Sequence, residues 1–489
     1  MSTLNSPKGA PAIDNGYPVR ALMALTATVL LVSYVETMIL PGVPVIQKDL
    51  STTATIASWI TSIVLLVGAI VSPLFGKFGD IYGKKKIIIV TLAFYTAGVA
   101  IAGFSTSIYF LLLARAIQGV GVAMIPLALA LLTDVFPKEK LAAAQGTIAG
   151  SAAISMALGL VLGSYVVQYF GWQMAFHSAA VLSAILFVIV ATVLKRDTVG
   201  SAHAKIDYTG VFVFALGVAL ILLYLTEGST IGWLSAEVLA FLASGLILTV
   251  LFFVHESKVA EPLIQLKLLR VRNVLLANLI TIVTGVVNFL AFFAFIYYAE
   301  LPRPFGLGFD ALATGLTLAP ATVVMFTVGI VVGRIVTKTG PKPILFTGAT
   351  ICILGFVLFV VNRATPIAIM FDIMIAFAGI VALVVPVVNM ISVSLPKESI
   401  SVGQGLNATL NQIGGAIGPV LTTTIIATYA QPLTSVGKGK PVVEAFSSVM
   451  AFNIIFAVAI AFSAICMVLT LAIRNGAFKK ENGNQPPNQ

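Results

Sequence analysis

The sequence predicts an all-α polytopic membrane protein, in which fourteen transmembrane helices form two six-helix halves with two further helices inserted between them. Two observations of composition predict the membrane environment: 59% of the 489 residues are hydrophobic and only 9% are charged, against about 45–50% and about 25% in soluble globular chains. The third observation is that the apolar residues fall in runs long enough to cross a bilayer, which takes about 20 residues of helix. A soluble fold could not bury so much apolar surface.

Short polar connectors separate the predicted spans. The spans cover approximately residues 20–44, 54–75, 87–105, 109–134, 141–168, 174–194, 208–226, 235–255, 273–299, 310–336, 343–361, 366–392, 401–429 and 446–473. No connector is long enough for a catalytic domain, and the sequence contains no nucleotide-binding loop and no cluster of metal ligands. We therefore predict no enzymatic activity, no catalytic residue, no metal site and no cofactor.

The lysine and arginine residues lie mainly on one side of the predicted membrane. Counted from a cytoplasmic N-terminus, 22 of the 28 fall in the tails and connectors on that side. This asymmetry follows the positive-inside rule and predicts a multi-pass protein of the cell (plasma or inner) membrane with both termini cytoplasmic. The net charge of +10 therefore reflects membrane orientation, and no soluble basic domain is available to bind nucleic acid.

An internal repeat divides the chain into two homologous halves. Residues 76–85 are similar to residues 333–342, at an offset of 257, and residues 137–139 reappear as residues 396–398, at an offset of 259. Both copies run in the same direction, which indicates a parallel repeat. The predicted organisation is a disordered cytoplasmic tail at 1–19, an N-terminal half at 20–195, a linker with two inserted helices at 196–256, a C-terminal half at 257–474 and a cytoplasmic tail at 475–489.

Charged residues inside the spans are the main candidates for function. Glu36 lies in the first span, where a carboxylate is unfavourable unless it is paired, hydrated or protonated. Arg115 lies in the fourth span at a similar predicted depth, with Gln118 nearly one turn further along, and Asp372 lies in the twelfth span. These four residues are candidates for proton coupling and substrate binding. The alternatives are a structural acid satisfied by neighbouring helices, an arginine that reaches the outer surface and, for Asp372, a role in a helix interface.

The connector between the second and third spans has a different character. Gly76 and Gly83 permit a tight turn at the membrane surface, and Asp80 can accept hydrogen bonds at a helix end or pair with nearby lysines such as Lys84. We predict that this segment is a conformational latch. The alternative is a basic loop that only sets the topology.

Small and polar residues mark two further features. Gly159 and Gly163, four residues apart in the fifth span, form a predicted close-packing face. The candidates to line a polar cavity are Tyr34, Asn288, Phe292, Asn389, Asn407 and Asn411. Hydrogen bonds between packed helices explain the asparagines equally well, and an aromatic residue such as Phe292 commonly faces core or lipid.

These motifs resemble those of the major facilitator superfamily. Residues 76–86 are similar to its signature loop between helices two and three, and the spacing Arg115-x-x-Gln118-Gly-x-Gly resembles its helix-four motif. The inserted helix pair and the segments 36–41 and 396–414 resemble the fourteen-helix drug:proton antiporter family. The resemblance extends over about residues 20–474.

The resemblance implies a secondary active transporter that exports small lipophilic or cationic compounds, as in multidrug efflux, by alternating access between the halves. It implies that Glu36 takes the place of the acidic residue of helix one, Arg115 that of the proton-relay arginine and Asp80 that of the acid of the conformational loop. The implied coupling ion is H⁺, the partners are a small-molecule substrate and the lipid bilayer, and we expect a monomer.

One motif matches the antiporter family less well. Gly159 and Gly163 fit the helix-five antiporter motif, but Leu160 replaces a usual proline and Ser164 a usual glycine. This departure weakens the prediction of antiport more than that of transport. A proton-coupled uptake or exchange carrier for a metabolite remains the alternative, because it would use the same fold and the same acid.

Overall fold

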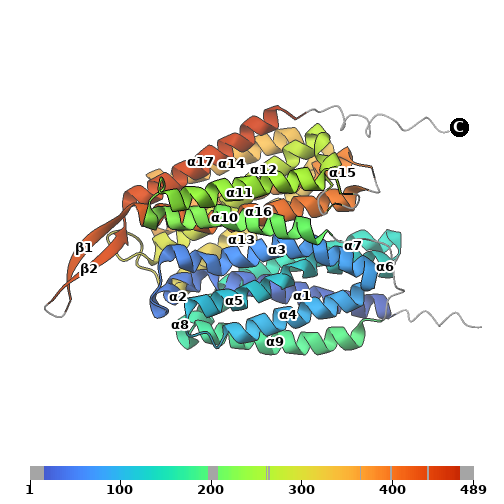
Figure 1. Ribbon diagram of the computed structural model, residues 1–489, viewed down its shortest axis with the longest axis horizontal. Coiled ribbons are helices and arrows are strands. Elements are labelled where there is room, and N and C mark those ends of the chain that lie inside the picture. The colour runs from blue at the N-terminus through green and yellow to red at the C-terminus, as the bar shows by residue number, and fades with distance from the viewer. Residues whose placement is uncertain are drawn as a thin grey trace, which may run out of the picture.

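The computed structural model describes residues 16–195, 207–259, 262, 265–363, 365–396, 399–437 and 440–473. Nearly all of these residues are helical, and the helices run side by side along one axis (Figure 1). The predicted disordered tail at 1–19 lies outside the described part of the chain as far as residue 15, and the predicted tail at 475–489 lies wholly outside it. α1 begins at Tyr17, three residues before the predicted boundary.

The N-terminal half confirms the six predicted spans, several of which are interrupted. Its elements are α1 (Tyr17–Met38), η1 (Leu40–Gly42), α2 (Val43–Asp49), α3 (Ala54–Tyr82), α4 (Lys84–Ala102), α5 (Ile108–Gly119), η2 (Val120–Ala123), α6 (Met124–Val135), α7 (Lys138–Leu158), η3 (Gly159–Gly163), α8 (Ser164–Phe170) and α9 (Trp172–Val193). η1 and η2 are 3₁₀ turns and η3 is a π-helical turn. Single spans therefore run through η1, η2 and η3.

The C-terminal half contains the other six spans and one unpredicted feature. Its elements are η4 (Leu266–Arg270), α12 (Arg272–Glu300), α13 (Ala311–Thr339), α14 (Pro341–Val361), α15 (Pro366–Ser394), α16 (Ile400–Thr428), β1 (Ala430–Gly437), β2 (Lys440–Ser447) and α17 (Val449–Leu471). The strands form an antiparallel hairpin that projects beyond the helix ends (Figure 1). The sequence had indicated only a connector there.

Fourteen helices or helix combinations thus account for the spans. Thirteen of them, within the described residues, are long and apolar enough to cross a membrane. The fourteenth, α16, is 29 residues long, the same length as α12, but it is rich in glycine and amide side chains. The fold class predicted from the sequence is therefore confirmed.

The internal repeat is visible in the backbone. Gly83 joins α3 to α4 with φ +97°, and Gly340 joins α13 to α14 with φ +80°. A left-handed backbone favours glycine, because it lacks the Cβ that would clash. The two glycines are 257 residues apart, so the same sharp connection occurs at the same place in each half.

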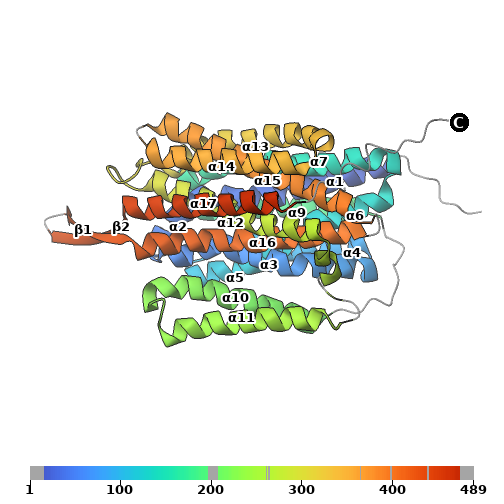
Figure 2. The same ribbon diagram turned by 90° about the horizontal axis from the view of Figure 1, so that it is seen from above.

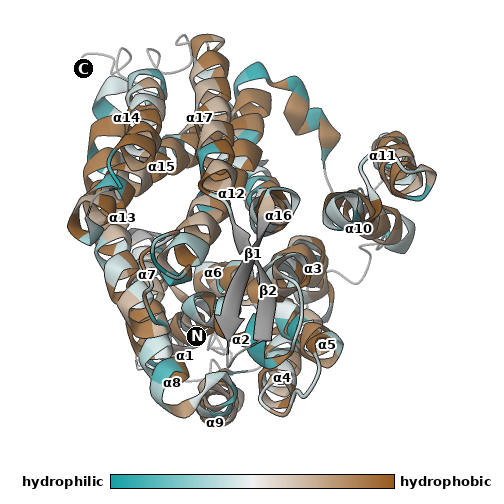
Figure 3. Cartoon of the chain, turned by 90° about the vertical axis from the view of Figure 1, so that its left-hand side faces the viewer, coloured by the Kyte–Doolittle hydropathy of each residue, from teal (hydrophilic) through white to brown (hydrophobic). Residues whose placement is uncertain are grey.

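The inserted pair, α10 (Tyr208–Ile231) and α11 (Ala236–Glu256), lies beside the two halves in space (Figures 2 and 3). α10 covers the line along which α3 of one half meets α16 of the other. Trp59 Nε1 donates to Thr226 Oγ1 at 2.9 Å, and Thr424 Oγ1 donates to the carbonyl of Leu225 at 2.8 Å. Adjacent residues of α10 are therefore bonded to opposite halves.

A hydrogen bond joins the other ends of the inserted helices. Asp207, the N-cap of α10, lies 2.9 Å from His255 Nε2 near the end of α11. Burial raises the pKa of Asp207, but hydrogen bonds from the Gly210 N–H and from His255 outweigh it and hold this pKa below its usual range. The carboxylate therefore stays ionised and keeps the pair joined.

The two halves meet at the hairpin end and separate at the opposite end. At the hairpin end Tyr297 Oη donates to Gln47 Oε1 at 3.0 Å across the halves, and a Cβ at Gly315 would lie 2.8 Å from Ser164 Cβ. At the other end a Cβ on Gly76 or Gly405 would meet nothing within 4 Å. These two glycines lie three helical turns from Leu65 and Ala416, which pack together in one cluster, so α3 and α16 diverge along their length.

Candidate proton-coupling and substrate site

Arg115 is fully buried within the N-terminal half. Its Nε donates to the carbonyl of Ile60 in α3 at 2.9 Å, and its Nη1 donates to Gln118 Oε1 at 2.7 Å. The guanidinium carbon lies 5.8 Å from the ring centroid of Phe176 in α9. The interpretation of Arg115 as a side chain that reaches the outer surface is therefore wrong. Its own helix α5 together with α3 and α9 holds this charge inside the half.

Glu36 lies on α1, half-buried, and interacts electrostatically with Arg115. Among the described residues no hydrogen bond or ion pair within 4 Å reaches its carboxylate. The arginine therefore supplies a positive field, while its hydrogen bonds go to Ile60 and Gln118. A carboxyl group in this position can exchange a proton or meet a cation without first breaking an ion pair.

Tyr95 belongs to the same group of residues, and the sequence reasoning missed it. The side chain is 1% exposed, and its hydroxyl lies near the Gln118 side chain without a hydrogen bond of ordinary geometry in the part of the protein described. It interacts electrostatically with both Arg115 and Glu36, and Gly121 leaves room for its ring. The sequence does offer a signal for Tyr95: it places a phenol in an apolar span, and a buried hydroxyl usually needs a partner.

Another buried polar atom remains open at this site. Arg115 Nη2 has no hydrogen-bond partner among the described residues. Buried polar groups are normally bonded to protein or ordered water. The site therefore has unused hydrogen-bonding capacity for water or a polar ligand.

Arg115→Lys should destabilise the protein although it preserves the charge. An ammonium group lacks the fixed fork that reaches Ile60 and Gln118 together, and the loss of one charged hydrogen bond costs about 1.5–3 kcal/mol. We expect a lower Tm of the purified protein in detergent. The matched control is Arg334→Lys on the exposed side of α13, and equal Tm values for the two variants would contradict this account.

Asp372 lies apart from this group. It is 4% exposed on α15 in the C-terminal half, and its Oδ2 has no hydrogen-bond partner within the described ranges. Its neighbours along the helix, Ile369 and Ile373, belong to the hydrophobic core of that half. No hydrogen bond or ion pair connects Asp372 with Glu36 or Arg115 in the described part of the chain. The structure therefore keeps the two acids separate.

Two of the predicted cavity residues lie in helix contacts of the C-terminal half. Asn407 is buried, and its Nδ2 donates to Asn278 Oδ1 at 3.1 Å and to Thr281 Oγ1 at 2.6 Å. Phe292 is 1% exposed and packs edge-on against Phe377 with ring centroids 4.5 Å apart. Both side chains therefore serve packing in this conformation.

The other cavity candidates are less enclosed. Tyr34 on α1, Asn288 on α12, Asn389 on α15 and Asn411 on α16 are all half-buried. Asn288 Oδ1 is a buried acceptor without a partner in the described chain. Among these four candidates, Asn288 in the C-terminal half is therefore the one with a buried acceptor left open for a ligand or a water molecule.

The predicted conformational loop consists of two helix ends. α3 continues through Gly76 and Asp80 to Tyr82, and the chain turns only at Gly83. The prediction of a turn at Gly76 is therefore wrong, since the helical hydrogen bonds persist there. Lys84, the first residue of α4, pairs with Asp134 of α6 at 2.7 Å.

Asp80 is exposed and makes no hydrogen bond with the described residues, although it lies within electrostatic range of Lys84 and Asp134. Lys84 Nζ also donates to the carbonyl of Ala130 at 3.1 Å. Asp134 was missed in the sequence reasoning. Its signal was an acid in the last turn of an apolar span that ends beside the basic connector.

Gly159 and Gly163 form the π-helical turn η3 and lie against α1. A Cβ at Gly159 would lie 2.6 Å from the carbonyl oxygen of Tyr34, and one at Gly163 would lie 2.6 Å from that of Met38. Real side chains do not approach so closely. The two glycines therefore let the backbones of α1 and η3 touch, within two residues of Glu36.

Comparison with known families agrees with this architecture. The sequence pattern of the Major Facilitator Superfamily matches residues 25–419, which covers most of the chain. The chain belongs to the major facilitator superfamily. It is therefore a membrane transporter of small molecules, not an enzyme.

Characterised and solved members of the superfamily are similar over most of their length. The multidrug transporter protein MdtP of Bacillus subtilis (strain 168) is 26% identical, with 74% of this chain and 66% of that protein aligned. The tetracenomycin C resistance and export protein of Streptomyces glaucescens is 26% identical, with 84% and 76% aligned. The xylose transporter XylE from E. coli shares the fold, with a TM-score of 0.60, 11% identity, and 92% and 97% of the two chains covered.

Proposed function

We propose that this major facilitator transporter exports small lipophilic or cationic compounds in exchange for protons. The observation that carries the proposal is the half-buried carboxyl group of Glu36, which lies in the electrostatic field of the buried Arg115 and is free of any ion pair within the described residues. Such a group can hold a proton in one conformation and a cationic substrate in another. Binding of one then favours release of the other.

The relatives support the export direction. One is named a multidrug transporter and another an export protein that confers tetracenomycin C resistance, each 26% identical to this chain. The substrates in these names are those of the two relatives.

The geometry of the halves supports alternating access. The ends that carry the hairpin are closed, while α3 and α16 diverge toward the opposite end. With both termini in the cytoplasm, as the positive-inside rule indicates, this is an inward-open conformation. Export then requires the contacts at the hairpin end to break.

Tyr297→Phe should weaken the closed outer end. It removes the hydroxyl that donates to Gln47, a hydrogen bond worth about 0.5–1.5 kcal/mol. We expect the outward-open population to rise by up to about tenfold, measured by electron paramagnetic resonance between labels at the exposed Phe104 and Val361. Tyr298→Phe is the control, since its ring packs on Phe359 and Phe452 of its own half. An unchanged distance distribution for Tyr297→Phe would refute this role.

The proposed coupling can be tested with the purified transporter in lipid vesicles that contain a pH-sensitive dye. A panel of lipophilic cations is added, and proton movement in the direction opposite to the cation is expected. Proton flux that depends on the cation supports exchange. Cation flux without proton movement would exclude proton coupling, and proton movement in the same direction as a metabolite would indicate an uptake carrier.

A further inference from the structure

Glu300, the last residue of α12, lies where the two halves meet at the hairpin end. Tyr297 lies three residues earlier on the same side of the helix, and its hydroxyl reaches Gln47 on α2 of the other half. Lys48 follows Gln47 along α2 and lies within electrostatic range of Glu300. The carboxyl group of Glu300 is therefore beside a contact that breaks when the halves move apart at this end.

The carboxyl group of Glu300 is only partly satisfied. The residue is half-buried, and its Oε1 atom is buried without a hydrogen-bond partner among the described residues. No ion pair within 4 Å reaches this group in the same part of the chain, although the Thr314 side chain lies nearby. An unpaired carboxylate is far more costly to bury than the neutral acid. The closed hairpin end therefore favours the protonated form.

Apolar side chains from both halves surround this position. The hydrophobic cluster that contains Tyr298 and Ala299 of α12 also contains Leu40 and Val43 of the N-terminal half. The loop after α12 folds back on the helix end, where the Phe309 N–H donates to the carbonyl of Ala299 at 2.8 Å. Separation of the halves would open this cluster and bring water to the carboxyl group, and water stabilises the charged form.

The charged groups around Glu300 do not compensate for its burial. Lys48 on α2 attracts the carboxylate, whereas Asp310, the N-cap of α13, repels it. Both side chains are exposed, so water and salt screen them. Arg303 in the loop donates to a carbonyl of the same loop, and Asp49 of α2 accepts a hydrogen bond from a tryptophan of its own half.

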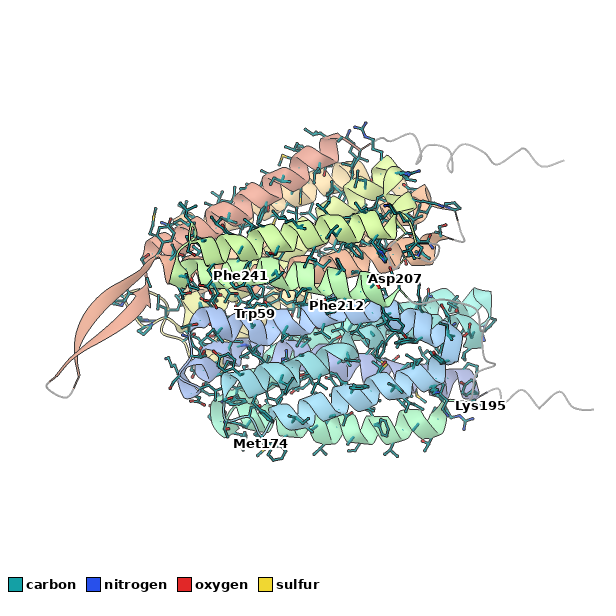
Figure 4. All side chains as sticks on the ribbon, viewed as in Figure 1. Trp59, Met174, Lys195, Asp207, Phe212 and Phe241 are labelled. Carbon is teal, nitrogen blue, oxygen red and sulfur yellow. The ribbon has the colours of Figure 1, made fainter. Side chains whose placement is uncertain are left out.

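The hairpin end is the outer end of the transporter under the positive-inside rule. That rule places basic residues such as Lys195 in the cytoplasm, and Lys195 lies at the opposite end of the bundle from the hairpin (Figure 4). When the halves part at the hairpin end, Glu300 therefore meets water outside the cell. Its proton passes to that water and not to the cytoplasm.

We propose that Glu300 is a second proton-binding site and acts as a pH-sensitive gate: its protonated form keeps the hairpin end closed, and loss of the proton to the outer side lets that end open. This proton returns to the side from which it came, so it is not the proton exchanged at Glu36. The proposal rests on the alternating access proposed above, but not on proton exchange. Because closing is linked to proton uptake, an acidic exterior holds this end closed.

The gate can be tested with the full-length transporter in lipid nanodiscs, in a Glu36→Gln background that removes the titration of the coupling acid. Electron paramagnetic resonance between labels at Phe104 and Val361 gives the ratio of outward-open to closed protein. We expect this ratio to rise at least about tenfold from about pH 5.5 to about pH 8.5, because one linked proton changes it by up to about tenfold per pH unit.

Adding Glu300→Gln should remove this pH dependence and keep the hairpin end closed at high pH, since glutamine is neutral like the protonated acid. The matched control is Glu237→Gln, which removes an exposed acid at the same end of the bundle, in the first turn of α11 (Figure 2). It should leave the pH dependence unchanged. A ratio that does not vary with pH would overturn the proposal, as would a pH dependence that survives Glu300→Gln or disappears in Glu237→Gln.

Lys48→Gln provides a second test, which still decides if Glu300→Gln does not fold. The lysine attracts the ionised acid across the halves but has no such attraction for the neutral acid. Its removal should therefore raise the outward-open fraction at high pH and leave it unchanged at low pH. An equal effect at both pH values would overturn the gate. A single closed distribution at every pH would overturn both the gate and alternating access, whereas a ratio that is merely independent of pH overturns the gate alone.

Discussion

Glu36→Gln should abolish proton-coupled transport while the protein remains folded. Glutamine has nearly the shape of glutamate, but it can neither release a proton nor neutralise a cation. Glu36 has no ion pair in the described structure, so its replacement does not deprive a paired cation of its counter-charge. Its only charged neighbour in electrostatic range among the described residues is Arg115, which keeps its hydrogen bonds to Ile60 and Gln118. A positioned proton-transfer group accounts for about 10²–10⁴-fold in rate, so we expect transport driven by a pH gradient to fall at least about 100-fold.

The measurement is uptake of a fluorescent lipophilic cation into inverted vesicles that are energised by an acid interior. Glu237→Gln is the matched control, since Glu237 is an exposed acid in the first turn of α11. It should transport like wild type. If Glu36→Gln kept transport within threefold of wild type, the coupling acid would have to be sought elsewhere. Asp372 would be the next candidate, because it is the other acid of the predicted site and is only 4% exposed.

Gly163→Ala should have the second largest effect, although it adds a single methyl group. That methyl group would meet the backbone of Met38 on α1, and the backbone cannot turn aside as a flexible side chain can. Overpacking of this kind costs about 1–3 kcal/mol. Because α1 carries Glu36 and η3 also borders α13 of the other half, we expect both the free energy of unfolding and the transport rate to fall.

Gly150→Ala is a matched control on the same span. A Cβ at Gly150 meets nothing within 4 Å, and alanine in a helix is favoured over glycine by about 0.5–1 kcal/mol. We expect equal or higher stability and unchanged transport, measured by thermal unfolding and vesicle assays. Equal behaviour of the two variants would show that close contact between α1 and η3 does not matter.

The spans could be predicted from the sequence because one physical property determines them. Each helix must carry about 20 apolar residues to satisfy the bilayer, and runs of this length are easy to recognise. The repeat was equally clear, and Gly83 and Gly340 confirm it with left-handed connections. Helix continuity was harder to predict: glycine at 76 suggested a turn, yet α3 continues to Tyr82, since a glycine within a spanning helix is tolerated.

The partners of the candidate residues depended on three-dimensional packing. Glu36 and Arg115 were expected at similar depth, and the structure places them within electrostatic range of each other. The direct partners of Arg115 are Gln118 and a backbone carbonyl of α3, and a carbonyl carries no sequence signal. Tyr95 likewise became relevant only once α4 was placed against α5.

The hairpin between α16 and α17 was missed for another reason. β1 and β2 lie beyond the helix ends (Figure 1), where the bilayer no longer requires a particular sequence pattern. Their antiparallel pairing runs from Ala430 with Ser447, next to the helices, to Gly437 with Lys440. The pattern of apolar runs therefore predicts what lies inside the membrane far better than what lies outside it.

The closed hairpin end has a consequence for the electrical tightness of the membrane. Ions and protons leak through a carrier along a file of water molecules, which needs a continuous gap. At this end Gly315 brings α13 against Ser164, and Gly163 brings η3 against α1, so close-packed atoms leave little room for such a file. We therefore expect the protein in this conformation to be nearly impermeable to ions and protons.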